Sequence, residues 1–246
     1  MKLFVVVVAL LSERFFVHAA SGKRFYWFSN YCHTLISKLQ KIPFLSSSWA
    51  KLVAVVTPLL TAASVILYIS GSIFYGFAEL VFNIIIFYYC LGPENPFYFK
   101  GSESSDSRTA NYLIEANSKL FAVIFWYMAL GPLATLLYRM ISLCQNEEQV
   151  DGNARLLTGI FEWLPAKMTA LLYLLAGNFQ AGFHHFAKLF FTLPSNNQNI
   201  LRLCGLGASG IGEEQSLNIP QAETLVEHAL LILLVLLSFL TLASWV

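Results

Sequence analysis

Long runs without a charged residue constrain this chain more than any other feature of its sequence. Three such runs, at residues 52–69, 120–138 and 229–246, approach the roughly 20 apolar residues that a membrane-spanning helix needs. A fourth run, 73–91, is interrupted by Glu79 near its middle and should form a helical hairpin with the run before it. The sequence therefore predicts an all-α, polytopic integral membrane bundle of four or five spans.

The overall composition agrees with a lipid environment. Hydrophobic residues make up 57% of the 246 positions and charged residues 12%, whereas soluble domains average about 45–50% apolar and 25% charged residues. We expect the lipid bilayer to be the main partner of this chain. The net charge of +1 gives no basic surface for nucleic acid, so we expect no nucleic-acid partner.

The N-terminus permits two interpretations. Lys2, the apolar residues that follow it and the small pair Ala19-Ala20 imitate a secretory signal peptide. Against this, Glu13 and Arg14 stand between the apolar core and the small residues, where a signal peptide is normally uncharged. We therefore favour a retained, partly inserted helix over residues 1–18, with the Glu13 and Arg14 charges at the membrane interface and not deeply buried.

The polar segments predict loops and interfacial helices within a single membrane domain, residues 1–246. Residues 93–118 and 192–227 are rich in Ser, Asn, Gly and acidic residues, so we expect aqueous loops. Residues 166–191 alternate apolar turns with Lys, His and Asn, which favours amphipathic helices at the membrane interface. Whether residues 1–18 and 166–191 cross the membrane is left open. Gly131-Pro132 should bend the span 120–138.

Basic residues indicate the orientation. Lysine and arginine are densest in residues 20–51, and the positive-inside rule places such a segment in the cytoplasm.

Few residues suggest catalysis. The four cysteines lie far apart, so we expect four reduced, buried thiols. His184 and His185 are adjacent and would point about 100° apart on a helix, which disfavours a shared metal ion. No nucleophile–base set and no phosphate-binding loop can be assembled, so we expect no metal, no cofactor and no catalytic residues.

One motif imitates a nucleotide site. The letters GLGASG, Gly205 to Gly210, fit G-x-G-x-x-G, but that fingerprint requires a preceding buried strand and a following helix. No β-α-β alternation surrounds it, so we interpret the segment as a flexible loop.

Four pieces of the sequence resemble a known family in their order and spacing. They are LFVVVVALLSERFF (3–16), FAVIFWYMALGPLATLLYRM (121–140), LLTGIFEWLPAKMTALLYLLAGNFQAGF (156–183) and the terminal span. Together they resemble AmpE, a type of bacterial inner-membrane protein that is itself similar to the CobD/CbiB family of membrane enzymes of cobalamin biosynthesis. The resemblance covers about half of the chain, and its most specific part is the block at 161–178.

The resemblance implies where a ligand would bind. In the cobalamin enzymes the matching block reads aspartate, apolar, Pro-Ala-Arg-Leu-Thr-Ala, and this region is implicated in binding a corrinoid and a phosphate-bearing partner. Glu162, Pro165, Lys167 and Thr169 stand at the matching positions here. We expect them to form a polar cluster at a helix start, where Pro165 would cost no hydrogen bond. An equally weighted alternative is that Lys167 merely snorkels to the headgroup level.

Two further pairs complete the candidate ligand or partner site. Glu13 and Arg14 are expected near the cluster, and Glu115 and Asn117 are fragments of a Glu-Asn motif of the cobalamin enzymes. The other motifs of those enzymes are absent or altered.

The resemblance implies a regulatory role. An AmpE-like protein would be a multi-pass protein of the bacterial inner membrane that modulates β-lactamase induction in response to cell-wall recycling, with a functional link to the amidase AmpD. A small anionic ligand, nucleotide or muropeptide-like, is a possible partner. The alternative is an adenosylcobinamide-phosphate synthase of the CobD/CbiB type, or a degenerate, ligand-binding relative.

Overall fold

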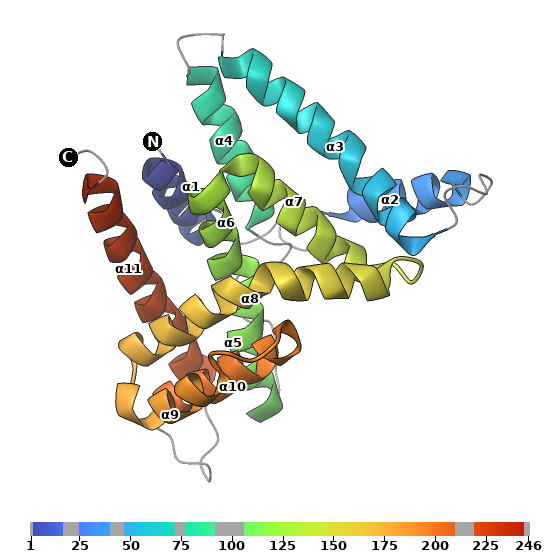
Figure 1. Cartoon of the computed structure of the whole chain (residues 1–246). Coiled ribbons are helices and arrows are strands. Elements are labelled where there is room, and N and C mark those ends of the chain that lie inside the picture. Colours follow the sequence, from blue (N-terminus) through green and yellow to red (C-terminus); the bar gives the residue numbers. More distant parts are fainter. Residues whose placement is uncertain are drawn as a thin grey trace. The chain divides into compact units, whose positions relative to one another are not determined.

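The structure is a computed structural model that describes residues 2–16, 25–39, 47–71, 77–91, 106–209 and 219–243. Every regular element among these residues is helical (Figure 1), which confirms the all-α prediction. The chain divides into two compact units. Residues 1–94 and 123–158 form the first unit, and residues 95–122 and 159–246 form the second.

The first unit is built from helices that pack in pairs. Its elements are α1 (Lys2–Phe16), α2 (Tyr26–Leu39), α3 (Ser48–Gly71), α4 (Phe77–Cys90), nearly all of α6 (Ala122–Leu130), α7 (Pro132–Leu143), the 3₁₀ turn η5 (Cys144–Asn146) and the first turns of α8 (Asp151–Ala176). Helix α1 packs against α4, while α3, α4 and α7 contact one another and α2 packs against α3. The contact between α3 and α4 is the one expected of a hairpin. Buried apolar side chains such as Val55 and Phe87 fill these interfaces.

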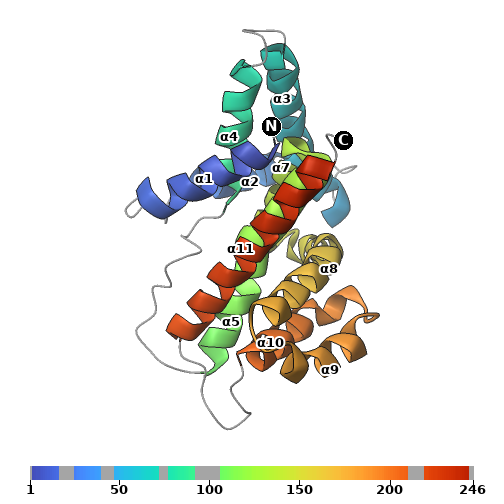
Figure 2. The same cartoon turned by 90° about the vertical axis from the view of Figure 1, so that its left-hand side faces the viewer.

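The second unit surrounds helix α5. It contains α5 (Asp106–Ala116), the π-helical turn η4 (Asn117–Phe121), the rest of α8, α9 (Phe179–Leu189), the 3₁₀ turn η6 (Pro194–Asn196), α10 (Asn197–Ala208) and α11 (Ile219–Ala243). Helix α10 packs against both α9 and α5, and α11 packs against α5 (Figure 2). These contacts bring α5 together with segments that follow it by about 90 residues or more.

Among the described residues, three helical segments are long and apolar enough to cross a membrane: α3 with 24 residues, Thr109–Leu130 with 22 and α11 with 25. Helix α4, with 14 residues, is apolar but shorter. Much of the outward surface of these helices is apolar, as at Tyr68 on α3 and Phe239 on α11. This helical character agrees with the predicted membrane protein.

The predicted span 120–138 has the wrong limits. The apolar helical segment runs from Thr109 to Leu130 and ends at Gly131. Gly131 has φ 92°, a conformation that glycine adopts without a steric penalty. Pro132 then opens α7, where its missing N–H costs nothing. The expected bend is therefore a complete break between two helices.

The predicted aqueous loops contain helices. Residues 192–227 include η6, α10 and the first turns of α11, and residues 106–116 of the loop 93–118 form α5. The buried residues of α10 include Ile200, Leu201, Cys204 and Ala208, which recur at helical spacing among polar neighbours. Because polar residues lie between these apolar ones, the segment was predicted to be a loop. Residues 92–105 and 210–218 lie outside the described residues.

Two details of the N-terminal half also differ from expectation. Helix α4 begins at Phe77, so Glu79 lies in its first turn and not in the middle of a span. An acidic side chain is favourable there because the N-terminal end of a helix carries partial positive charge. Residues 2–16 of the predicted helix 1–18 form α1, and residues 17 and 18 lie outside the described residues.

Candidate functional site

The candidate block lies inside one long helix. The sequence had suggested that Pro165 lies at a helix start. Helix α8 begins at Asp151, however, so Pro165 lies in the helix interior. An interior proline lacks the N–H that would donate to the carbonyl four residues earlier, and its ring crowds that carbonyl. The expectation of a cost-free proline is therefore wrong, because Pro165 removes one backbone hydrogen bond from α8 two residues before Lys167.

Lys167 is a buried lysine surrounded by aromatic rings. Its side chain is only 4% exposed, and its ammonium lies 3.6 Å from the ring centroid of Trp163 and 5.3 Å from that of Phe190. The ammonium also reaches the carbonyl oxygen of Thr192 at 3.5 Å, which is a long hydrogen bond. This burial lowers the pKa of the Lys167 ammonium below its ordinary value.

No carboxylate among the described residues lies within ion-pairing distance of Lys167. The positive charge is thus held by ring faces and one carbonyl. A cation over an indole ring is stabilised by the ring quadrupole, but a buried charge without a counter-ion is costly. An anionic group bound next to Lys167 would offset that cost.

Thr169 faces a different neighbour. Its hydroxyl donates to the side-chain carbonyl of Asn117 at 2.9 Å, and both residues are at most 1% exposed. The amide nitrogen of Asn117 is buried and has no hydrogen-bond partner. Buried polar atoms without partners are rare and often mark a strained or functional position.

Asn117 opens a π-helical turn. Residues Asn117–Phe121 form η4, in which the backbone hydrogen bonds are shifted by one residue from the α-helical register. Such turns leave a nearby carbonyl without its usual partner and are frequent at functional sites. The carbonyl of Leu113, one turn earlier, accepts a hydrogen bond from the hydroxyl of Tyr173 at 2.9 Å. Helix α8 is therefore bonded to this irregular stretch at two points.

Glycines of α10 allow the close packing around this stretch. A Cβ atom on Gly205 would lie 2.6 Å from a methyl group of Leu113, and one on Gly207 would lie 2.9 Å from the Cα atom of Gly182 on α9. The interpretation of residues 205–210 as a flexible loop is thus wrong for Gly205 to Ala208, which are helical, and Gly210 lies outside the described residues. The glycines serve helix packing, because their missing side chains let α10 approach its neighbours.

The predicted residues of α8 do not form a single cluster. Lys167 and Thr169 are two residues apart and so point about 200° apart around the helix axis. Each accordingly has its own contacts, Lys167 at the connection between α9 and η6, and Thr169 at η4. Glu162 is seven residues before Thr169, which places it on the same side of α8, and it is half-buried.

The contacts of Lys167 and Thr169 given above involve neither Glu115 nor Glu13. Glu115 forms an ion pair with Lys119 one turn later at 2.7 Å, an ordinary i,i+4 arrangement. Glu13 belongs to the first unit and is only 1% exposed, so the expectation of an interfacial, unburied charge is wrong for it. Hydrophobic residues Val5, Val6 and Ala9 of the same helix are also buried, which explains how α1 carries Glu13 inward. The side chain of Arg14 lies outside the described part of the chain.

Sequence reasoning missed the aromatic surroundings of Lys167. Trp163 precedes Lys167 by four residues, a spacing that places two helical side chains together, so this contact could have been read from the sequence. The contribution of Phe190 and Thr192 could not, because it depends on the turn after α9. Cys32, Cys90, Cys144 and Cys204 are all buried, which confirms the predicted burial of the four cysteines, and their reduced state stays a prediction. No cluster of three metal-ligating side chains occurs among the residues that the structure describes.

Comparison with known proteins gives a partial similarity. The chain is 29% identical over 107 residues to the cobalamin biosynthesis protein CobD of Chromobacterium violaceum. The match spans 40% of this chain and 34%, about a third, of that protein. No family model matches the sequence, and no solved structure matches it. The similarity supports a CobD/CbiB-like relationship and does not single out AmpE.

Proposed function

We propose that this protein is a multi-pass regulator of the bacterial inner membrane, of the AmpE type, that binds a small anionic ligand through Lys167. It would be a relative of the CobD/CbiB proteins that signals and does not catalyse. In this role it would modulate β-lactamase induction in response to cell-wall recycling, in functional association with the amidase AmpD.

The buried ammonium of Lys167 carries this proposal. It is 4% exposed and rests on the Trp163 ring, and within the described chain it has no carboxylate partner. Buried charges are normally paired, so a lysine of this kind suits an anionic ligand that completes the pair. The Trp163 ring would hold the ammonium in place before the ligand arrives.

On binding, a ligand oxygen would replace the Thr192 carbonyl as the hydrogen-bond acceptor of the Lys167 ammonium. The carbonyl oxygen of Thr192 is the present acceptor for the ammonium, at the long distance of 3.5 Å. A phosphate or carboxylate oxygen would accept a shorter, charge-assisted hydrogen bond, which is roughly twice as strong as a neutral one. The residues around Thr192 would then move away from Lys167. That displacement is the conformational signal that we propose.

Asn117 and Thr169 would act as positioning residues. Their hydrogen bond fixes α8 against η4, two residues from Lys167 along the helix. The resemblance of the block containing Lys167 and Thr169 to a ligand-binding segment of the cobalamin enzymes supports the choice of this region. The nucleotide or muropeptide identity of the ligand, and the link to AmpD, rest on the AmpE resemblance.

A complementation experiment tests the regulatory role. In a strain that lacks the gene, we expect the wild-type protein and a Lys188→Met control to restore β-lactamase induction, and Lys167→Met to fail although its membrane level is normal. Lys188 is an exposed lysine of α9, so its replacement removes the same charge at the surface. Full induction with Lys167→Met would refute the proposal.

The similarity to CobD favours a second candidate, an adenosylcobinamide-phosphate synthase. The Asp-Pro and His-Pro steps that the cobalamin enzymes carry after their first helix are missing here, which argues against full corrinoid chemistry. Purified protein distinguishes the two functions. ATP turnover that depends on cobyric acid would establish the synthase, and its absence together with a Lys167-dependent induction defect would support the regulator.

A further inference from the structure

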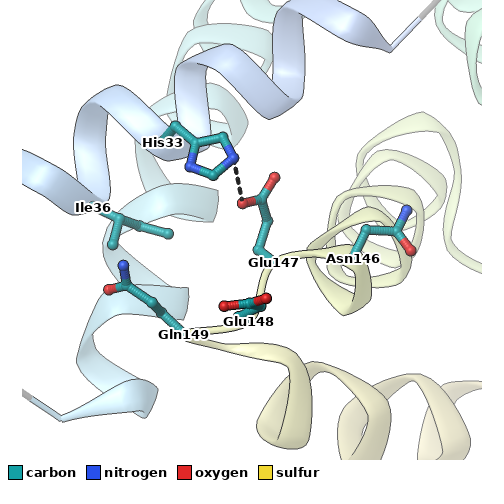
Figure 3. Close-up of a pocket in the computed structure, with 6 residues that line it drawn as sticks. All are labelled: His33, Ile36, Asn146, Glu147, Glu148 and Gln149. Atoms are coloured by element: carbon teal, nitrogen blue, oxygen red, sulfur yellow. Dashed lines mark ion pairs between the residues drawn. The ribbon is translucent and has the colours of Figure 1, made fainter.

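A polar pocket lies in the first unit, and none of the candidate site residues that the sequence suggested lines it. It has a volume of about 330 Å³ and is lined by His33, Ile36, Asn146, Glu147, Glu148 and Gln149 (Figure 3). This volume is at the lower end of the range for small-molecule sites. The lining residues come from α2 and from the turn that follows η5.

Local structure explains how these residues meet. Ser29, His33 and Ile36 are spaced i, i+4 and i+7, so they share one face of α2. Opposite them, the N–H of Val150 donates to the carbonyl of Glu147 at 3.0 Å and closes a tight turn. Glu148 and Gln149 are the central residues of that turn, and both are exposed.

The Glu147 carboxylate is fixed between two partners. One oxygen accepts a hydrogen bond from the hydroxyl of Ser29 at 2.8 Å, and the other lies 3.3 Å from Nε2 of His33. The side chain of Glu147 is 8% exposed, whereas that of His33 is 73% exposed. The pocket therefore has a preformed, largely buried carboxylate with a solvent-facing imidazole beside it.

The remaining lining indicates the charge of a ligand. Glu148 adds a second carboxylate, while His33 is the one lining group that can be positive. The nearby ammonium of Lys51 is engaged with the side-chain oxygen of Gln149 at 3.2 Å. The two carboxylates of the lining, Glu147 and Glu148, therefore favour a cationic ligand over an anionic one.

The side chains that line the pocket favour an organic ammonium group over a metal ion. A divalent metal would need three or more suitable ligands, and no such group is found within the described ranges. Carboxylate and amide oxygens accept well from an ammonium group, which offers three donors. Ile36 supplies an apolar wall that suits an alkyl chain.

We propose that this pocket binds a small alkylammonium ligand, with its charge on Glu147 and Glu148 and its chain against Ile36. Glu148 determines the specificity of the pocket, because its exposed side chain projects from the turn. The site is independent of Lys167 and of the proposed regulatory function, so either proposal can fail without the other.

Calorimetric titration of the purified, detergent-solubilised full chain tests this site, with 1,4-diaminobutane as the probe. We expect saturable binding of one molecule, with about tenfold or greater weakening in Glu148→Gln, as for the loss of a charged hydrogen-bond partner. Asp151→Asn is the matched control, because it removes a nearby carboxylate that pairs with Arg155 and does not line the pocket. Butanoate and 1-butanol, with similar chains but no ammonium, should not bind.

A second variant tests whether probe binding can be lost while the fold is kept. His33→Lys places a tethered ammonium beside the Glu147 carboxylate from an exposed position of α2, so the fold should persist while the probe no longer binds. The proposal is overturned if the probe does not bind at concentrations up to about 10 mM. It is equally overturned if Glu148→Gln and Asp151→Asn bind alike, if His33→Lys binds the probe normally, or if butanoate binds as well as the diamine.

Discussion

The hydroxyl of Thr169 donates to the side-chain carbonyl of Asn117 at 2.9 Å, joining helix α8 to a π-helical turn in the interior of the second unit. The same turn region receives the Tyr173 hydroxyl at the Leu113 carbonyl. Both bonds are buried, and removing the partner of a buried polar group is costly. The π turn is thus held in place by a helix that lies later in the chain.

Removing the Thr169 hydroxyl should destabilise the protein. Thr169→Val keeps the side-chain shape but leaves the Asn117 carbonyl buried without this donor, so we expect a loss of about 1–3 kcal/mol in the free energy of unfolding. Thr224→Val is the control, since Thr224 is exposed on α11 and bonds only the carbonyl of Pro220. Denaturant unfolding in detergent micelles measures both. Equal effects of the two variants would contradict the role given to the Asn117–Thr169 bond.

Removing the Lys167 charge should not destabilise the fold. Replacing a buried charge by an apolar residue of similar length is often neutral or stabilising, so Lys167→Met should unfold at the same or a higher temperature than wild type. The same variant should lose induction in cells. A clear loss of thermal stability with induction intact would show that Lys167 serves packing and not ligand binding.

Stability should rise with pH through the titration of Lys167. Burial lowers the pKa of its ammonium, so between this pKa and the ordinary lysine value the unfolded chain binds more protons than the folded one. The free energy of unfolding then increases as pH rises through this window and falls as pH drops through it. The difference between wild type and Lys167→Met in unfolding midpoint, followed from pH 7 to about 10.5, isolates this contribution. A flat difference curve would contradict the lowered pKa.

The affinity of Lys167 for an anion should fall as pH rises, over the same pH range in which the stability rises. The ligand needs the protonated ammonium, so its affinity should fall as pH rises through the lowered pKa of Lys167. Titration with inorganic phosphate at several pH values measures this. Lys188→Met should behave like wild type, and an affinity that does not change with pH would place phosphate elsewhere.

Two glycines should respond oppositely to alanine. A Cβ on Gly207 would lie 2.9 Å from the backbone of Gly182, so Gly207→Ala should cost about 1–3 kcal/mol through overpacking. Gly152 is also helical, but a Cβ atom added there would have no neighbour within 4 Å, so Gly152→Ala should stabilise by about 0.5–1 kcal/mol. Unfolding curves of the two variants compare these effects directly. If Gly207→Ala were also stabilising, α10 would not be packed as described.

Sequence reasoning succeeded where one physical signal dominated. Uncharged runs located α3 and most of α11, because exclusion from water acts on each long segment separately. It failed at α10, whose apolar residues are few and buried among polar ones, and at the start of the segment Thr109–Leu130, where Thr109 and Asn117 are polar yet buried. Hydropathy does not register polar residues whose burial depends on hydrogen bonds from distant helices.

The candidate site, too, could be predicted from the sequence only in part. The block from Glu162 to Thr169 could be chosen from its composition and its family resemblance, and the contact of Trp163 with Lys167 follows from helical spacing. Because α8 continues through Pro165, the two-residue spacing of Lys167 and Thr169 also places their side chains on different sides of the helix. The pocket beside His33 could not be anticipated, because it joins residues more than 100 positions apart.

The outer half of α3 has a consequence for how this protein is made. Val65, Ile66, Tyr68 and Ile69 all face outward there, and little of that helix is covered by the rest of the chain. Such a surface would drive self-association in water before the later helices were synthesised. We therefore expect the chain to meet a bilayer during translation, and we expect a delay in membrane targeting to yield insoluble aggregates instead of a slowly maturing protein.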